Sequence, residues 1–82
     1  MLKAVAVKLE DIYIPAARRK ELDQGKVDEI VEAMLNDDEQ KPVKIREGKG
    51  RYVLVAGIHR LEACKAVGEN TIDAYIVQAP KF

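Results

Sequence analysis

Several residue types on which common protein chemistry depends are scarce or missing in this chain of 82 residues. It contains one cysteine, which excludes an intrachain disulfide and indicates a reducing compartment. It contains no serine, which excludes a Ser-His-Asp catalytic triad. With one histidine beside the one cysteine, no Cys/His spacing suits a bound metal ion. The commonest nucleophilic and metal centres are therefore not expected.

A net charge of either sign and long apolar runs are also absent. Fourteen basic and fourteen acidic residues cancel, so no global field attracts nucleic acid or anionic lipid. No apolar run approaches the ~20 residues that span a bilayer, and the start of the chain is too alternating for a signal peptide. We expect one complete globular domain over residues 1–82, located in the cytoplasm and without membrane contact.

The first half of the chain predicts a strand and a helix. Leu2 to Leu9 alternates apolar residues with lysines, which is typical of a short strand, and 10–15 is a turn and a short extended piece because Pro15 disfavours helix before it. Asp23 is placed to cap a helix that runs to about Leu35. The apolar positions of this helix recur at helical spacing and predict one core-facing stripe: Val27, Ile30, Val31, Met34 and Leu35.

The second half predicts a hairpin, a second helix and a last strand. Val43 and Ile45 alternate with basic residues as a half-buried strand, 47–50 forms the turn, and 52–56 is the returning strand. The second helix ends at Gly68, and the segment after it, up to Val77, is rich in strand-forming residues. The order β-α-β-β-α-β predicts a compact α+β domain.

The most informative segment is 53–67, which is a buried strand, one glycine and a helix that begins with two basic side chains. A helix N-terminus carries partial positive charge and unpaired N–H groups. His59 and Arg60 therefore cost a few tenths to about 1 kcal/mol there unless an anion lies near. A bound phosphate supplies that charge. The alternative is that Arg60 pairs with Glu62 or Glu29 and that His59 merely packs. Spacing alone favours neither interpretation.

Taken together, these residues resemble the ParB/sulfiredoxin superfamily. The shared pattern consists of Leu22-Asp23-Gln24-Gly25-Lys26-Val27, a helix, Lys41-Pro42-Val43-Lys44-Ile45, a hairpin, Gly57-Ile58-His59-Arg60 and Thr71-Ile72. The glycine turn reads Gly-Cys-His-Arg in sulfiredoxins, Gly-Glu-Arg-Arg in ParB proteins and Gly-His-His-Arg in free serine kinases. The resemblance implies a mixed sheet and a phosphate site formed by Gly57, Ile58, His59 and Arg60. It also implies a nucleotide ligand, ATP or CTP, which Mg can accompany.

Further residues are expected around this site. Arg18 or Arg19 is expected to reach the phosphates from the early loop. Lys26 and Glu29 are the candidates on the nucleoside side, and the base preference is left open. We therefore expect a stand-alone domain that binds a nucleotide or another phosphorylated small molecule, with a protein partner or a second copy of itself as further candidates.

Departures from the family pattern limit the chemistry that the resemblance implies. Ile58 stands where the nucleophilic cysteine of sulfiredoxins would be, and Cys64 is expected to be a buried core residue, so a sulfiredoxin-type reductase is not expected. Ala16 follows Pro15 where serine kinases carry a glutamate. The helix-turn-helix of partition proteins is not encoded in this sequence. The alternatives are a weak nucleotide hydrolase or phosphotransferase, and a DNA-associated module.

Two charged clusters have competing interpretations. Five cations surround the predicted hairpin and form either a nucleic-acid patch or, as the favoured reading, a basic edge strand that resists aggregation: Lys41, Lys44, Arg46, Lys49 and Arg51. The acidic loop 37–39 could hold a divalent ion, but a solvated loop is favoured, and no metal ligand is assigned.

Overall fold

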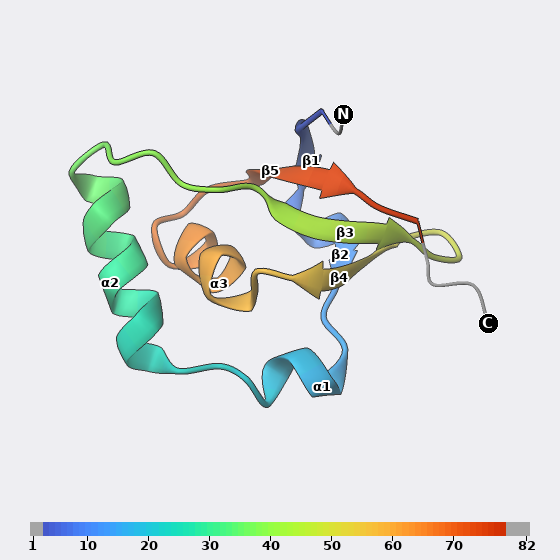
Figure 1. The fold of residues 1–82 in the computed structure, drawn as a ribbon, viewed down its shortest axis with the longest axis horizontal. Helices are drawn as coiled ribbons and strands as arrows, with labels where there is room; N and C mark the ends of the chain where they lie inside the picture. The colour runs from blue at the N-terminus through green and yellow to red at the C-terminus, as the bar shows by residue number, and fades with distance from the viewer. Residues whose placement is uncertain (1–2, 79–82) are drawn as a thin grey trace.

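The computed structural model describes residues 3–78 of the chain (Figure 1). Its strands are β1 (Val5–Lys8), β2 (Ile12–Tyr13), β3 (Val43–Glu47), β4 (Tyr52–Ala56) and β5 (Thr71–Ile76). Its helices are α1 (Ala16–Arg19), α2 (Gln24–Leu35) and α3 (Ile58–Ala66), and a 3-10 turn, η1 (Leu9–Asp11), joins β1 to β2. Among these described helices, none is long and apolar enough to cross a membrane.

The strands form one mixed sheet in the order β1-β5-β3-β4-β2. β3 runs parallel to β5 and antiparallel to β4, while β1 is antiparallel to β5 and β2 is parallel to β4. The predicted α+β class with a mixed sheet is confirmed. The predicted basic edge strand is wrong, because β3, which carries Lys44 and Arg46, lies at the centre of the sheet. β5, which comes later in the chain, pairs with the other side of β3. The residues of the hairpin do not predict this long-range pairing.

One face of the sheet packs against α3 and forms the core with it. Ile45 and Leu54 of the sheet are at most 2% exposed, and so are Leu61 and Cys64 of α3. Burial alternates along β3 with the period of two expected for a strand that has one covered face. Each fully buried aliphatic side chain contributes about 1.5–3 kcal/mol. The core therefore fixes how α3 lies against the central strands.

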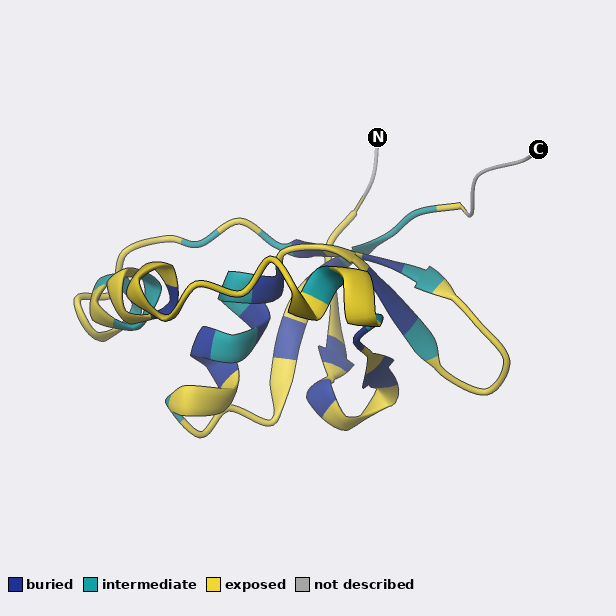
Figure 2. Cartoon of the chain, turned by 90° about the horizontal axis from the view of Figure 1, so that it is seen from below, coloured by how far each residue is buried: buried dark blue, intermediate teal, exposed yellow. Residues whose placement is uncertain are grey.

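Helix α2 lies outside α3, which separates it from the sheet (Figure 1). Its N-cap is the predicted one, because Asp23 Oδ1 accepts a hydrogen bond of 2.9 Å from the N–H of Gly25. The predicted apolar stripe is confirmed only in part. Val27 is buried, but Leu35 at the end of the stripe is 72% exposed. α2 packs against one helix, α3, which covers a narrower strip of its surface than a sheet would. Most of the surface of α2 is therefore exposed (Figure 2).

Two short elements, β2 and α1, flank Pro15. β2 falls within the extended piece predicted before Pro15, whereas no helix was predicted where α1 lies. β2 pairs with β4 over two residues. α1 is a single turn after Pro15, whose carbonyl oxygen accepts the N–H groups of Arg18 and Arg19. The later boundaries agree closely with the prediction: β5 ends one residue before Val77, and α3 is followed by Gly68 at φ 82°. Of the predicted first strand, Leu2 lies outside the described residues.

Candidate phosphate-binding site

The candidate site is centred on the turn that joins β4 to α3. Gly57 occupies this turn with φ 105° and ψ 32°, in the left-handed region. A Cβ atom at Gly57 would lie 2.7 Å from Val43 Cγ1 and 3.2 Å from Val43 Cα. Both the backbone conformation and the close approach of β3 therefore require glycine here.

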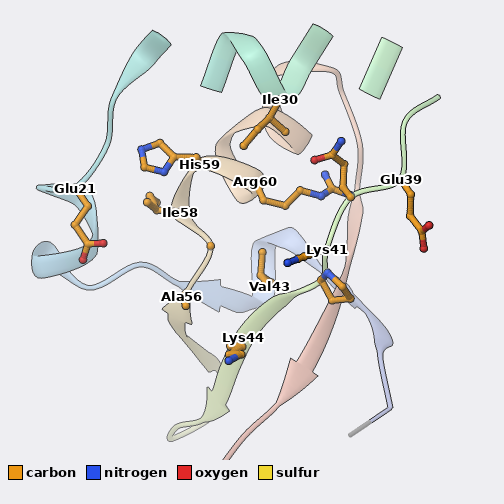
Figure 3. A pocket seen from close by; sticks show the side chains of 13 residues that line it. Glu21, Ile30, Glu39, Lys41, Val43, Lys44, Ala56, Ile58, His59 and Arg60 are labelled. Atoms are coloured by element: carbon orange, nitrogen blue, oxygen red, sulfur yellow. The ribbon is translucent and has the colours of Figure 1, made fainter. Parts of the chain in front are cut away.

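Helix α3 begins with no capping side chain and with no acidic residue in its first turn. Its first helical hydrogen bond runs from the N–H of Leu61 to the carbonyl oxygen of Gly57, at 3.0 Å. The amide groups of Ile58, His59 and Arg60 precede that bond, so they have no acceptor within the helix. This end of the helix lines a cleft of about 620 Å³ (Figure 3). An uncapped N-terminus facing a cleft is suited to an anion.

Charged side chains of both signs line the same cleft. Glu21 and Glu39 lie on opposite sides of it, and Lys41 and Lys44 lie at the start of β3 (Figure 3). Ile30 of α2 contributes an apolar wall together with Val43 and Ile58. Glu21, Glu39 and Ile30 were not predicted as site residues. Ile30 could have been predicted, because it belongs to the core-facing stripe of α2. The two glutamates could not, because their segments show no pattern beyond being polar.

His59 connects the starts of two helices. Its Nε2 accepts a hydrogen bond of 3.0 Å from the backbone N–H of Asp23, the N-cap of α2. Nε2 therefore carries no proton in this arrangement. Although His59 lines the cleft, its ring extends toward the N-terminus of α2 (Figure 3). The residue does more than pack, because it ties α2 to the glycine turn.

Arg60 extends in the opposite direction from His59 (Figure 3). Its Nη1 lies 3.3 Å from the sulfur of Met34 and also contacts the sulfur of Cys64, while its Nε is buried without a partner. The predicted alternative, a pair with Glu62 or Glu29, is not found among residues 3–78, and Glu62 lies 3.8 Å from Lys65 instead. Sulfur is a weak acceptor, so the guanidinium group is poorly satisfied where it lies.

Cys64 has the properties of the predicted core residue. It is 1% exposed, and burial raises the pKa of its thiol, an effect that the neighbouring Arg60 partly offsets. Ile58, at the position of the sulfiredoxin nucleophile, is 3% exposed and joins the core. Neither position presents a reactive thiol to the cleft. Within residues 3–78, no group of three or more His, Cys, Asp or Glu side chains is arranged to hold a metal ion.

The remaining predicted site residues are not brought to the cleft. Arg18 forms an ion pair of 2.8 Å with Glu21, and Arg19 Nε lies 3.4 Å from the carbonyl oxygen of Ile14. Lys26 and Glu29 are exposed on α2, and the wall of the cleft there is formed by Ile30 instead. Of these residues, Arg18 is linked to the cleft indirectly, because its ion-pair partner Glu21 lines the cleft.

The five cations around the hairpin are divided between two surfaces. Lys41 and Lys44 line the cleft. The guanidinium of Arg51 lies 3.8 Å from the centre of the Tyr13 ring, and Arg46 Nη1 lies 3.5 Å from the carbonyl oxygen of Glu47. Lys49 is exposed in the hairpin turn. The structure therefore does not form a single patch from all five.

Comparison with known proteins agrees with this architecture. The family model of the ParB N-terminal domain matches residues 3–81. The chain is 34% identical over 77 residues to a chloroplastic/mitochondrial sulfiredoxin of Arabidopsis thaliana, covering 94% of this chain and 62% of the relative. It is 32% identical over 62 residues to a probable chromosome-partitioning protein ParB of Campylobacter jejuni, covering 76% of this chain and 22% of the relative. The chain thus spans less than two thirds of either relative.

Solved structures share the fold over nearly the whole chain. The crystal structure of the Arabidopsis thaliana sulfiredoxin matches with a TM-score of 0.80 and 32% identity, over 94% of this chain and 86% of that chain. A C-terminally truncated ParB from Caulobacter crescentus, complexed with CTP-gamma-S, matches with a TM-score of 0.79 and 17% identity, over 96% and 46% of the two chains. A mutant free serine kinase in complex with ADP matches with a TM-score of 0.77 and 21% identity, over 90% and 30%.

The sheet, the glycine turn and the open start of α3 define an α+β domain of the ParB/sulfiredoxin type. The chain belongs to the ParB N-terminal domain family. The family resemblance inferred from the glycine turn and its flanking motifs is confirmed by the family match and by both relatives.

Proposed function

We propose that this domain binds the phosphates of a nucleotide, or of another phosphorylated small molecule, at Gly57–Arg60. The observation that carries the proposal is the start of α3, which is uncapped, has two basic residues in its first turn and faces a cleft of about 620 Å³. A pocket of this size is within the range that holds a small-molecule ligand. The backbone amides supply donors, and the basic side chains add charge.

Structural relatives support a nucleotide as the ligand. The ParB from Caulobacter crescentus was solved with CTP-gamma-S, and the free serine kinase with ADP. Both share the fold with this chain over at least 90% of its length. The two nucleotides differ in their base and share the ribose and the phosphate chain, and the phosphates are the part that a helix N-terminus binds.

Arg60 has to leave its contacts with the two sulfur atoms to bind a phosphate. This change is favourable because a phosphate oxygen accepts far better than the sulfurs of Met34 and Cys64 do. A hydrogen bond to a charged group contributes about 1.5–3 kcal/mol. His59 can donate from Nε2 to a phosphate only in a tautomer that carries a proton on Nε2, and it must then release the N–H of Asp23. Binding should therefore loosen the attachment of α2 to α3.

The residues of the cleft also limit the chemistry that we propose. Mg²⁺ is commonly held by one or two carboxylates together with the phosphates of its nucleotide. Glu21 and Glu39 are the carboxylates that line this cleft, on opposite sides of it, so one of them would hold the ion together with the phosphates, and the ion would neutralise phosphate charge. Glu29 and Glu62, the other two glutamates named in the sequence analysis, do not line it. We therefore propose binding, and we extend it neither to hydrolysis nor to sulfinic acid reduction.

A thermal-shift panel tests this proposal. The native protein is unfolded with ATP, CTP, GTP, their diphosphates or inorganic phosphate, each with and without Mg²⁺. A ligand that binds the native state raises the melting temperature. Arg60→Ala should weaken the best ligand by about 1.5–3 kcal/mol, while Lys65→Ala, which removes a cation from the exposed end of the same helix, should not. No shift with any nucleotide, or equal affinities for the two variants, would contradict the assignment.

A further inference from the structure

The face of the sheet opposite α3 carries aromatic and basic side chains in adjacent rows. The strand register pairs Tyr13 and Arg46 with Val53, so these three residues share this face. The next row pairs Lys44 with Tyr75. The alternate residues on the same strands, such as Ile45 and Leu54, are buried toward α3. We call this surface the open face and define it as Tyr13, Lys44, Arg46, Val55 and Tyr75, of which Lys44 also lines the cleft.

The open face is exposed at several positions, although Val53 within it is only 7% exposed. Tyr13 is 43% exposed and Val55 36%, although both are large hydrophobic residues on strands. Lys44 is exposed, and Arg46 and Tyr75 are half-buried. α3 contacts β3 and β5 through their other face, where the core lies. Exposed aromatic and aliphatic residues gathered on one face indicate an interaction surface.

The charge on this face is positive although the whole chain is neutral. Lys44 and Arg46 lie on it, and Arg51 adds its guanidinium against the Tyr13 ring, at 3.8 Å from the ring centre. Asp73 is the carboxylate of β5 that faces the same way, because it alternates with the buried Ala74. On this face three cations stand against one carboxylate, but Asp11 and Glu47 line a pocket with Arg51, and the acidic loop 37–39 lines a pocket with Tyr75. The positive charge that fits a negatively charged partner is therefore centred on β3, at Lys44 and Arg46.

We propose that the open face binds single-stranded nucleic acid. The cations follow the phosphate backbone, and the Tyr13–Arg51 pair and the Tyr75 ring offer flat groups on which unpaired bases stack. Bases in a duplex are already stacked on one another and cannot use these rings. An acidic peptide would satisfy the cations but would leave the exposed aromatic rings without a flat partner. The combination of cations and rings on a sheet therefore favours an unpaired strand.

Fluorescence anisotropy with a short labelled oligothymidine, over a series of salt concentrations and with excess CTP present, tests this proposal. Tyr13→Leu keeps an apolar residue but removes the ring, and should weaken binding between about 5-fold and 150-fold. Arg46→Ala should weaken binding and reduce the salt slope of the affinity by about 0.7 for the lost phosphate contact. Lys65→Ala, on the exposed end of α3, is the control and should bind like the native protein.

Three outcomes would overturn the proposal. Equal affinity for a duplex of the same length would mean that the face does not use unpaired bases. Unchanged binding of a folded Tyr13→Leu variant, with folding checked by circular dichroism, would mean that the cations act alone. Lys44 belongs to both surfaces, so loss of oligonucleotide binding on addition of CTP, together with unchanged binding by Arg46→Ala, would place the strand in the cleft at α3 instead of on the open face.

Discussion

Replacement of Gly57 tests the geometry of the turn on which the phosphate site depends. Gly57→Ala places a Cβ atom 2.7 Å from Val43 Cγ1 at a position where φ is 105°. The left-handed backbone costs about 1–2 kcal/mol for alanine. Overpacking against a buried valine adds about 1–3 kcal/mol. We therefore expect a loss of about 2–5 kcal/mol, a large part of the stability of a domain of this size.

Two other glycines of the chain provide matched controls. Gly68 and Gly50 also have positive φ, at 82° and 69°, but a Cβ atom at either would meet nothing within 4 Å. Gly68→Ala and Gly50→Ala should therefore cost only the backbone term, about 1–2 kcal/mol. Urea unfolding followed by circular dichroism measures all three losses. Equal losses for Gly57→Ala and Gly68→Ala would refute the contact with Val43 as the reason for glycine at this turn.

A double variant separates the contact from the backbone effect. Val43→Ala removes the Cγ1 atom that a Cβ at position 57 would meet most closely. The loss in Gly57→Ala/Val43→Ala should then be smaller than the two single losses added together, by roughly 1 kcal/mol, within the range for residues in contact. Strict additivity would show that the two residues do not constrain each other.

Further variants test the core and the helices. Cys64→Ala should cost about 1 kcal/mol and should not weaken nucleotide affinity in calorimetry, because it only removes a contact that Arg60 gives up on binding; lost binding would show that the thiol takes part in the site. Burial raises the pKa of Cys64, so the stability contributed by its neutral thiol is lost as pH rises through that raised value. The urea midpoint of the native protein should accordingly fall more steeply above about pH 9 than that of Cys64→Ala. Leu35→Gln should change stability by less than about 0.5 kcal/mol because Leu35 is 72% exposed, whereas a cost of several kcal/mol would mean that a partner covers it. Asp23→Ala should cost about 1 kcal/mol through the lost N-cap, and an unchanged urea midpoint would contradict that role.

Local chemistry explains which parts of the fold could be predicted from the sequence. Asp23 and Gly68 mark the start of α2 and the end of α3 through capping, which depends only on adjacent residues. The hairpin between β3 and β4 follows from a short glycine-containing turn between two apolar strands. Gly57 was found for the same reason, as a single glycine between a buried strand and a helix.

Long-range pairing and side-chain direction explain the parts that could not be predicted. The two residues of β2 form a strand only because β4 lies beside them, and β3 is central only because β5 returns next to it. The spacing that places Arg60 in the first turn of α3 does not specify that its guanidinium contacts Met34 on α2. Leu35 continues the apolar stripe of α2 in sequence, but α3 does not extend beneath it.

The central claim is that the start of α3 binds phosphate, and amide chemical shifts measure this most directly. A ¹⁵N-labelled sample is titrated with the nucleotide that gives the largest thermal shift, and with inorganic phosphate. The claim predicts that the N–H signals of Ile58, His59 and Arg60 move most and together, since their amides have no acceptor within the helix. Saturating shifts confined to other segments, or none in these three amides, would contradict it.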